Sequence, residues 1–177
     1  MENIDKFRYP IGKFVKPEVI HDDIIQDWIG AIKSFPKMLR DEAYKLTEAD
    51  LEKRYRPNGW TIRQIIHHCA DSHMNSFIRF KLALTEETPV IKPYAEELWA
   101  ELADTKSGPV ESSLKILEGL HERWVQLINS LSGKDLEKQF KHPQTAELIS
   151  VKTNIGLYAW HCEHHLAHVR GAKLKSF

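Results

Sequence analysis

The sequence predicts an all-α fold, a four-helix bundle in which long crossover connections join the helices. Four segments repeat apolar side chains at steps of three and four residues, which is the period of an amphipathic helix. Alternating, strand-like character is confined to residues 140–152. A length of 177 residues suits one domain, so we expect residues 1–177 to fold as a single bundle.

The first predicted helix covers residues 22–45. Its apolar stripe comprises Ile25, Trp28, Ile29, Ile32, Phe35, Leu39 and Ala43. Pro36 falls inside this stripe. Because proline lacks an N–H and crowds the carbonyl group of Ile32, we expect the helix to kink or restart there.

The second predicted helix covers residues 61–84. It follows the turn sequence Arg56-Pro57-Asn58-Gly59. Thr61, with Gln64 three residues later, has the pattern of a capping box, which indicates where the helix begins.

Three long connections separate the helices. The third helix is expected over residues 110–131, ended by Ser132-Gly133, and the fourth over residues 153–173. The segment 85–109 contains three prolines and a predicted short helix over residues 94–103. A strand pair is expected around residues 146–151. Connections of this length permit neighbouring helices to run parallel, so the order of the helices stays open.

Composition excludes several classes of function. Lys plus Arg and Asp plus Glu each number 25, so the formal charge is zero. A nucleic-acid-binding protein needs a basic face, and none is indicated. No segment has the length and apolarity of a membrane span. Two cysteines without CxxC spacing favour a cytoplasmic protein with reduced, buried thiols. The expected partner is a small-molecule substrate.

Histidines are concentrated in two helices. Of ten in the chain, three lie within residues 67–73 and four within residues 161–168. On the last helix, His165 lies about 60° and His161 about 100° from the centre of the apolar stripe, on the same side. His164 and His168 lie about 160° and about 120° from it and are expected to face solvent. The pair bordering the core, His161 and His165, is therefore the favoured metal-binding pair.

On the second predicted helix, the apolar periodicity does not identify a single candidate ligand. His68 and His67 lie about 120° and about 140° from the centre of its stripe, on opposite sides, so periodicity does not choose between them. His73 lies within about 20° of the centre and is expected to be a core histidine bonded to a carbonyl group rather than a ligand.

Both histidine segments resemble a known family. The segment Gly59–His73, GWTIRQIIHHCADSH, and the segment Leu157–His168, LYAWHCEHHLAH, resemble the two signatures of the DinB/YfiT-like metal-dependent hydrolases. The resemblance covers nearly the whole chain. In that family a histidine eight residues after the tryptophan joins an HxxxH pair on the last helix. The resemblance thus implies His68, His161 and His165 as metal ligands, an unusual helix order, and a homodimer, for which Trp99 and Trp160 are candidate contact residues.

Three neutral imidazoles leave a divalent metal with an open position, as in catalytic zinc sites. Zn²⁺ is the default ion, and Ni²⁺ also suits imidazole ligands. An activated water at the open position would make the protein a hydrolase, although the sequence offers no clear general base. An activated thiol would make it a low-molecular-weight thiol S-transferase of the bacillithiol type, an activity associated with some relatives. A non-catalytic, stress-related metal-binding module is the third hypothesis.

Overall fold

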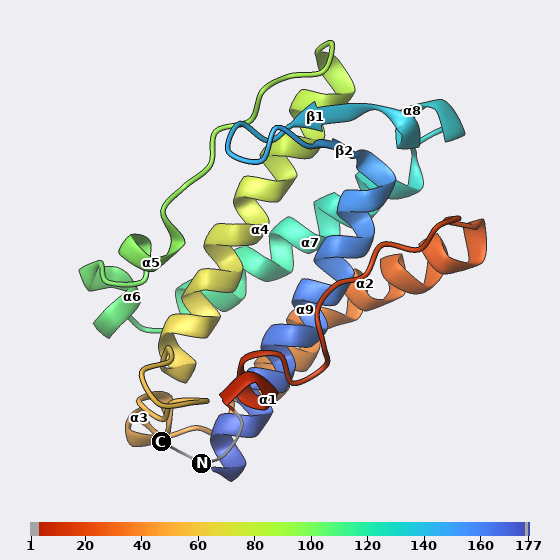
Figure 1. The fold of residues 1–177 in the computed structure, drawn as a ribbon. Helices are drawn as coiled ribbons and strands as arrows, with labels where there is room; N and C mark the ends of the chain where they lie inside the picture. Colours follow the sequence, from red (N-terminus) through yellow and green to blue (C-terminus); the bar gives the residue numbers. More distant parts are fainter. Residues whose placement is uncertain (1–3, 176) are drawn as a thin grey trace.

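The computed structural model describes residues 4–175 and 177, and it confirms the predicted all-α bundle (Figure 1). Four long helices form it: α2 (Asp22–Ala43), α4 (Ile62–Thr85), α7 (Glu111–Asn129) and α9 (Val151–Leu174). Helices α2 and α4 each pack mainly against α7 and α9, so the order around the bundle is α2–α7–α4–α9. Helices α2 and α4 are therefore diagonal to each other, as are α7 and α9, although each pair is consecutive among the long helices of the chain.

The long connections set the helix directions. Helix α4 runs parallel to its neighbour α7, and α2 runs parallel to its neighbour α9 (Figure 1). Ion pairs agree with this arrangement, because Glu42 near the end of α2 contacts Arg170 and Lys173 near the end of α9. The order is therefore not a simple up-down-up-down bundle, as the connection lengths permitted.

Short elements occupy the connections. They are α1 (Ile4–Arg8), α3 (Glu48–Leu51), α5 (Glu96–Trp99), α6 (Ala103–Ser107), α8 (Gly133–Glu137), β1 (Gln139–Lys141) and β2 (Leu148–Ser150). The two strands pair antiparallel, with Phe140 opposite Ile149. A strand pair is therefore present, but only β2 lies within the expected residues 146–151, and β1 precedes them. The single short helix expected over residues 94–103 is instead two short helices, α5 and α6.

Helix α2 continues through Pro36 without a break, so the expected restart does not occur. Proline cannot donate to the carbonyl oxygen four residues earlier, which belongs to Ile32. That oxygen is bonded instead by Nδ1 of His121 on α7, at 2.7 Å. A side chain of a neighbouring helix thus replaces the backbone donor that Pro36 removes.

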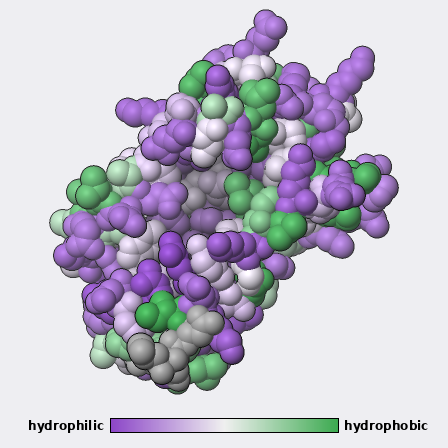
Figure 2. Space-filling model, viewed as in Figure 1, coloured by the Kyte–Doolittle hydropathy of each residue, from purple (hydrophilic) through white to green (hydrophobic). Residues whose placement is uncertain are grey.

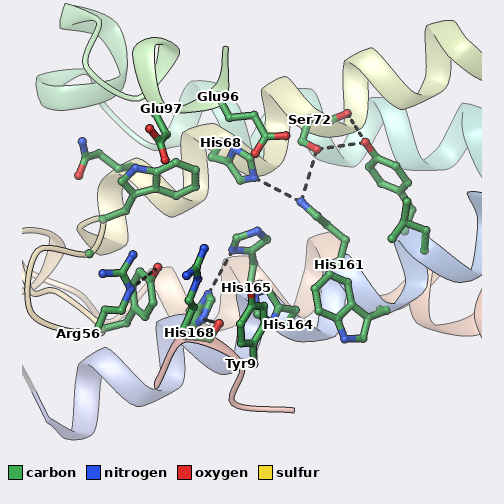
Figure 3. A pocket seen from close by; sticks show the side chains of 18 of the residues that line it. Tyr9, Arg56, His68, Ser72, Glu96, Glu97, His161, His164, His165 and His168 are labelled. Carbon is green, nitrogen blue, oxygen red and sulfur yellow. Dashed lines mark hydrogen bonds between the residues drawn. The ribbon is translucent and has the colours of Figure 1, made fainter. Parts of the chain in front are cut away.

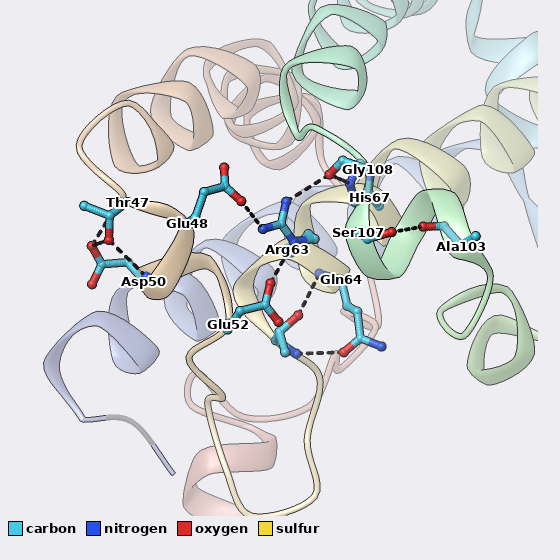
Figure 4. A network of polar contacts seen from close by, with 11 residues as sticks. Thr47, Glu48, Asp50, Glu52, Arg63, Gln64, His67, Ala103, Ser107 and Gly108 are labelled. Carbon is cyan, nitrogen blue, oxygen red and sulfur yellow. Dashed lines mark hydrogen bonds and ion pairs between the residues drawn. The ribbon is translucent and has the colours of Figure 1, made fainter.

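The start of α4 is fixed by a polar network (Figure 4). The Thr61–Gln64 capping box is present as predicted. In the same turn, the buried guanidinium group of Arg63 donates to Glu48, to Glu52 and, at 3.0 Å, to the carbonyl oxygen of Gly108. The loop before α4 and the crossover after it are thereby tied to the same helical turn.

Helix α9 is covered on nearly all sides. Gly156 faces the Trp28 ring so closely that a Cβ atom there would lie 2.6 Å from it. The segment that precedes α2 crosses the outer face of α9 (Figure 1), where the Trp160 indole donates to the carbonyl oxygen of Gly12 at 3.1 Å. Across the described residues, no helix has the length and apolarity needed to span a membrane.

Candidate metal centre

A cavity of about 870 Å³ opens between α4, α9, the α5 crossover and the N-terminal segment. Figure 2 shows the hollow near the middle of this face, with mostly hydrophilic side chains around it. Histidines from α4 and α9 form its floor, and Tyr9, Arg56, Glu96 and Glu97 approach from the surrounding connections (Figure 3).

His68, His161 and His165 meet on this floor (Figure 3). Their candidate ligand nitrogens all lie within 4.8 Å of one another, and the Nε2 atoms of His68 and His161 are 3.3 Å apart. Zn–N bonds of about 2.0–2.1 Å in tetrahedral geometry place two ligand nitrogens about 3.3 Å apart. The observed spacing therefore suits a metal held between the two helices.

Burial keeps these imidazoles neutral. Desolvation lowers the pKa of His68 to about 4, and it lowers the pKa values of His161 and His165 well below the usual value. A neutral imidazole keeps the lone pair that a metal requires. The three side chains are therefore ready to bind a cation at neutral pH without first losing a proton.

The prediction that His164 and His168 face solvent is wrong. Both are buried, at 7% and 3% exposure, because the N-terminal segment lies over this face of α9. His164 stacks on Trp160, and its Nδ1 has no hydrogen-bond partner among the described residues. Nε2 of His168 lies 3.1 Å from the carbonyl oxygen of Phe7, and its Nδ1 lies 3.4 Å from Nδ1 of His165.

His67 and His68 are adjacent in the chain, but only His68 lines the cavity. His67 points away from the cavity, with its ring nitrogens 2.8 Å from the Ser113 hydroxyl and 3.2 Å from the carbonyl oxygen of Gly108. His68 points into the cavity beside Trp60. The sequence left this choice open until the resemblance was considered, because both residues lie far from the centre of the apolar stripe.

His73 is fully buried, as expected, but it does not bond a carbonyl group. Its Nδ1 lies 2.6 Å from Nε2 of His121, and its Nε2 lies 3.0 Å from Nδ1 of His161. His121, for which the sequence predicted no role, is also buried. These two residues and Cys162 also form a second group of possible ligand atoms within 4.8 Å of one another, entirely inside the core.

Two carboxylates of the crossover reach the cavity, and the sequence did not single them out. Glu96 and Glu97 lie in the first turn of α5, and both line the cavity that His68 also lines (Figure 3). Partial burial raises the pKa of the Glu96 carboxyl group. The residues lie in the crossover, in the short helix predicted over residues 94–103, and no local pattern connects that helix with histidines on α4 and α9.

Both cysteines are excluded from the cavity. Cys69 and Cys162 are buried at 0% and 1% exposure, and burial raises the pKa of each thiol. A protonated, inaccessible thiol is neither a nucleophile nor a ready metal ligand. This agrees with their interpretation as small core residues.

Comparison with known proteins gives consistent matches. The sequence profile of the DinB superfamily matches residues 31–169. A protein of Oceanobacillus iheyensis named as a putative metal-dependent hydrolase is 51% identical over 162 residues, which are 92% of this chain and 93% of the relative. A protein of Bacillus cereus with the same description is 52% identical over 166 residues, 94% of this chain and 95% of the relative.

A solved structure is similar over the same extent. It is YfiT from Bacillus subtilis, described as a probable metal-dependent hydrolase with an unusual four-helix bundle topology. The TM-score is 0.91 at 44% identity, covering 93% of this chain and 94% of that one. The matched profile spans most of the chain, and relatives at about half identity are covered almost end to end. The chain belongs to the DinB superfamily.

Proposed function

We propose that the protein is a metal-dependent hydrolase that binds one divalent ion per chain through His68, His161 and His165. The 3.3 Å spacing of the His68 and His161 Nε2 atoms carries this proposal, because it suits two ligands of one metal. The relatives named as metal-dependent hydrolases support it. Zn²⁺ is the first candidate for a three-imidazole site, and Ni²⁺ is the second.

A divalent ion in such a site supplies Lewis acidity, which makes water a nucleophile near neutral pH. The chain's own residues supply the rest. The three histidines leave the side facing the cavity free of protein ligands, so water and substrate enter from there. We propose Glu96 as the group that accepts the proton from the attacking water, since its carboxyl group lines the cavity and partial burial raises its pKa.

A low-molecular-weight thiol S-transferase is the second candidate. The cavity of about 870 Å³ has room for a thiol and an electrophile together. This reaction would need an activated thiolate and no water-directed general base. Arg54 and Arg56 line the cavity and supply positive charge for an anionic group of either reactant.

One assay separates the candidates. Protein loaded with Zn²⁺, stripped with a chelator, and reloaded would be tested on a panel of esters and amides and on electrophiles with added small thiol. Thiol-independent hydrolysis that disappears on stripping and returns on reloading supports the hydrolase. A thioether product with complete thiol dependence replaces it with the transferase. Metal binding without turnover on either panel would favour a non-catalytic, stress-related metal-binding module.

We also propose a homodimer. The Trp160 indole donates to the N-terminal segment, so it does not support this proposal, whereas Trp99 remains partly exposed. Light scattering at micromolar concentration would show a mass near twice 20.6 kDa for a dimer. A single-chain mass would contradict the proposal.

A further inference from the structure

Imidazole rings behind the proposed metal ligands are connected in two chains, and each chain ends on backbone carbonyl oxygens. The longer chain runs from His161 through His73 and His121 to the carbonyl oxygen of Ile32. The shorter runs from His165 through His168 to the carbonyl oxygens of Phe7 and Arg8. Neither His73, His121 nor His168 belongs to the proposed ligand set.

The direction of the longer chain follows from its end. A carbonyl oxygen only accepts hydrogen bonds, so Nδ1 of His121 must carry a proton, and Nε2 of this neutral ring then accepts. His73 therefore donates from Nδ1 to His121 and accepts at Nε2. His161 in turn donates from Nδ1 to His73, which leaves its Nε2 unprotonated, with the lone pair facing His68 and, at 3.4 Å, the Ser72 hydroxyl group.

The shorter chain gives the same result for His165. Nε2 of His168 donates to the carbonyl oxygens of Phe7 and Arg8, at 3.1 and 3.2 Å. Its Nδ1 is then an acceptor, and the 3.4 Å contact is a bond donated by Nδ1 of His165. Nε2 of His165 is left unprotonated.

We infer that these two relays set the tautomers of His161 and His165, so that each ring presents an unprotonated Nε2 to the metal; this inference rests on the proposed function. His73, His121 and His168 are positioning residues in this arrangement. A metal-bound histidine usually donates its other N–H to a carboxylate or carbonyl oxygen, which fixes the ring. Here the acceptors are other imidazole rings, His73 for His161 and His168 for His165, and these rings in turn lead to backbone carbonyl oxygens.

The longer relay takes one residue from each long helix: Ile32 from α2, His121 from α7, His73 from α4 and His161 from α9. The last acceptor of this relay, the carbonyl oxygen of Ile32, is available to His121 because Pro36 leaves it without a helical donor. The relay thereby couples ligand orientation to the packing of all four helices. The shorter relay couples it to the N-terminal segment.

The test measures Zn²⁺ affinity by competition with a chromophoric chelator. His73→Leu removes the acceptor of the His161 bond, and we expect affinity to fall 10- to 100-fold, the usual effect of losing such a partner. His73→Gln places an amide oxygen near the former Nε2 and should retain most of the affinity. His168→Leu and His168→Asn form the corresponding pair for His165, with a smaller difference because that contact is longer.

His67→Leu is the control. His67 is buried on the same helix but bonds Ser113 and Gly108, outside the relays. Its replacement should lower the unfolding temperature without changing the Zn²⁺ affinity of the folded protein. Equal losses for His73→Leu, His73→Gln and His67→Leu would mean that only general packing matters, and would overturn the relay.

A second measurement needs no variant. Long-range ¹H–¹⁵N spectra of the metal-free protein should show a protonated Nδ1 and an unprotonated Nε2 for His73, His121, His161 and His165. A protonated Nε2 at any of them overturns the inference.

Metal stoichiometry is a further check. A second bound Zn²⁺ that disappears in His73→Leu would also overturn the inference, since the cluster of His73, His121 and Cys162 would then be a metal site. A wild-type protein with the expected spectra that binds no metal would instead refute the proposed function, and with it the relays' role.

Discussion

The side chains of His68 on α4 and His161 on α9 approach to 3.3 Å between their Nε2 atoms, although 93 residues separate them in the chain. The two helices are antiparallel neighbours in the bundle, and both turns that carry these histidines are packed on a common core. The spacing is therefore set by helix packing rather than by a mobile loop, which favours a preorganised site.

The first prediction concerns metal content. His68→Ala, His161→Ala and His165→Ala should each reduce the bound Zn²⁺ from about one per chain to a small fraction, because two imidazoles hold the ion far less tightly than three. His67→Ala and His164→Ala should keep it. Elemental analysis of the purified variants after dialysis measures this. Retention of a full equivalent in His165→Ala would contradict the proposed ligand set.

The second prediction concerns the packing of α9 on α2. Gly156→Ala places a Cβ atom 2.6 Å from the Trp28 ring, so the helices must separate or the ring must move. We expect a loss of about 1–3 kcal/mol in the free energy of unfolding, as for other overpacked cores. Gly171→Ala on the same helix meets nothing within 4 Å and should be neutral or stabilising by about 0.5 kcal/mol. Urea denaturation measures both, and similar values for the two variants would refute the close contact.

The third prediction concerns acid sensitivity. Burial lowers the pKa of His68 and His121 to about 4, whereas the same groups in the unfolded chain titrate near 6.5. Between these values the unfolded state binds more protons than the folded state, so stability is full above about pH 6.5 and falls toward pH 4. Each such histidine contributes a slope of up to about 1.4 kcal/mol per pH unit.

Thermal unfolding of the metal-free protein from pH 7.5 to pH 4.5 measures this slope. His121→Asn should flatten the curve, because it removes one buried imidazole whose pKa is lowered. A metal-free protein whose unfolding temperature stays constant over this range would contradict the neutral, buried state of the histidines.

The sequence predicted the long helices and the histidine pair on α9 because both depend on local periodicity. The burial of His164 and His168 could not be predicted in this way, since it comes from the N-terminal segment, which lies more than 140 residues away in the chain. An apolar stripe locates the face that packs on the bundle core but says nothing about a second covering segment.

The role of His121 was missed for a related reason. It is a single histidine on α7, and its partner atoms belong to α2 and α4. One local signal was available: Pro36 leaves the carbonyl oxygen of Ile32 without its backbone donor, so a side-chain donor had to be found somewhere. Which donor fills that place depends on the helix order, which the sequence left open.

The fourth prediction concerns the thiols. Cys69→Ala and Cys162→Ala should each lower the free energy of unfolding by about 1 kcal/mol, because each leaves a small void in a closely packed core. Turnover by the metal-loaded double variant should match that of the wild type, since neither thiol reaches the cavity. A double variant that folds and binds Zn²⁺ but has lost its activity would show that a cysteine takes part in the reaction.

The last prediction concerns the carboxylates of the crossover. If the protein is a hydrolase and Glu96 accepts the proton from water, Glu96→Gln should lower kcat by about 10²-fold or more while the Zn²⁺ affinity stays unchanged. Glu101→Gln is the matched control, because Glu101 also lines the cavity but bonds Lys106 and Gln64. The two variants carry the same change of charge, so a difference between them reports position rather than the local electrostatic field. Equal rates for both variants would remove Glu96 from the mechanism. A reaction that needs added thiol and proceeds unchanged in Glu96→Gln would favour the transferase, in which no water has to be deprotonated.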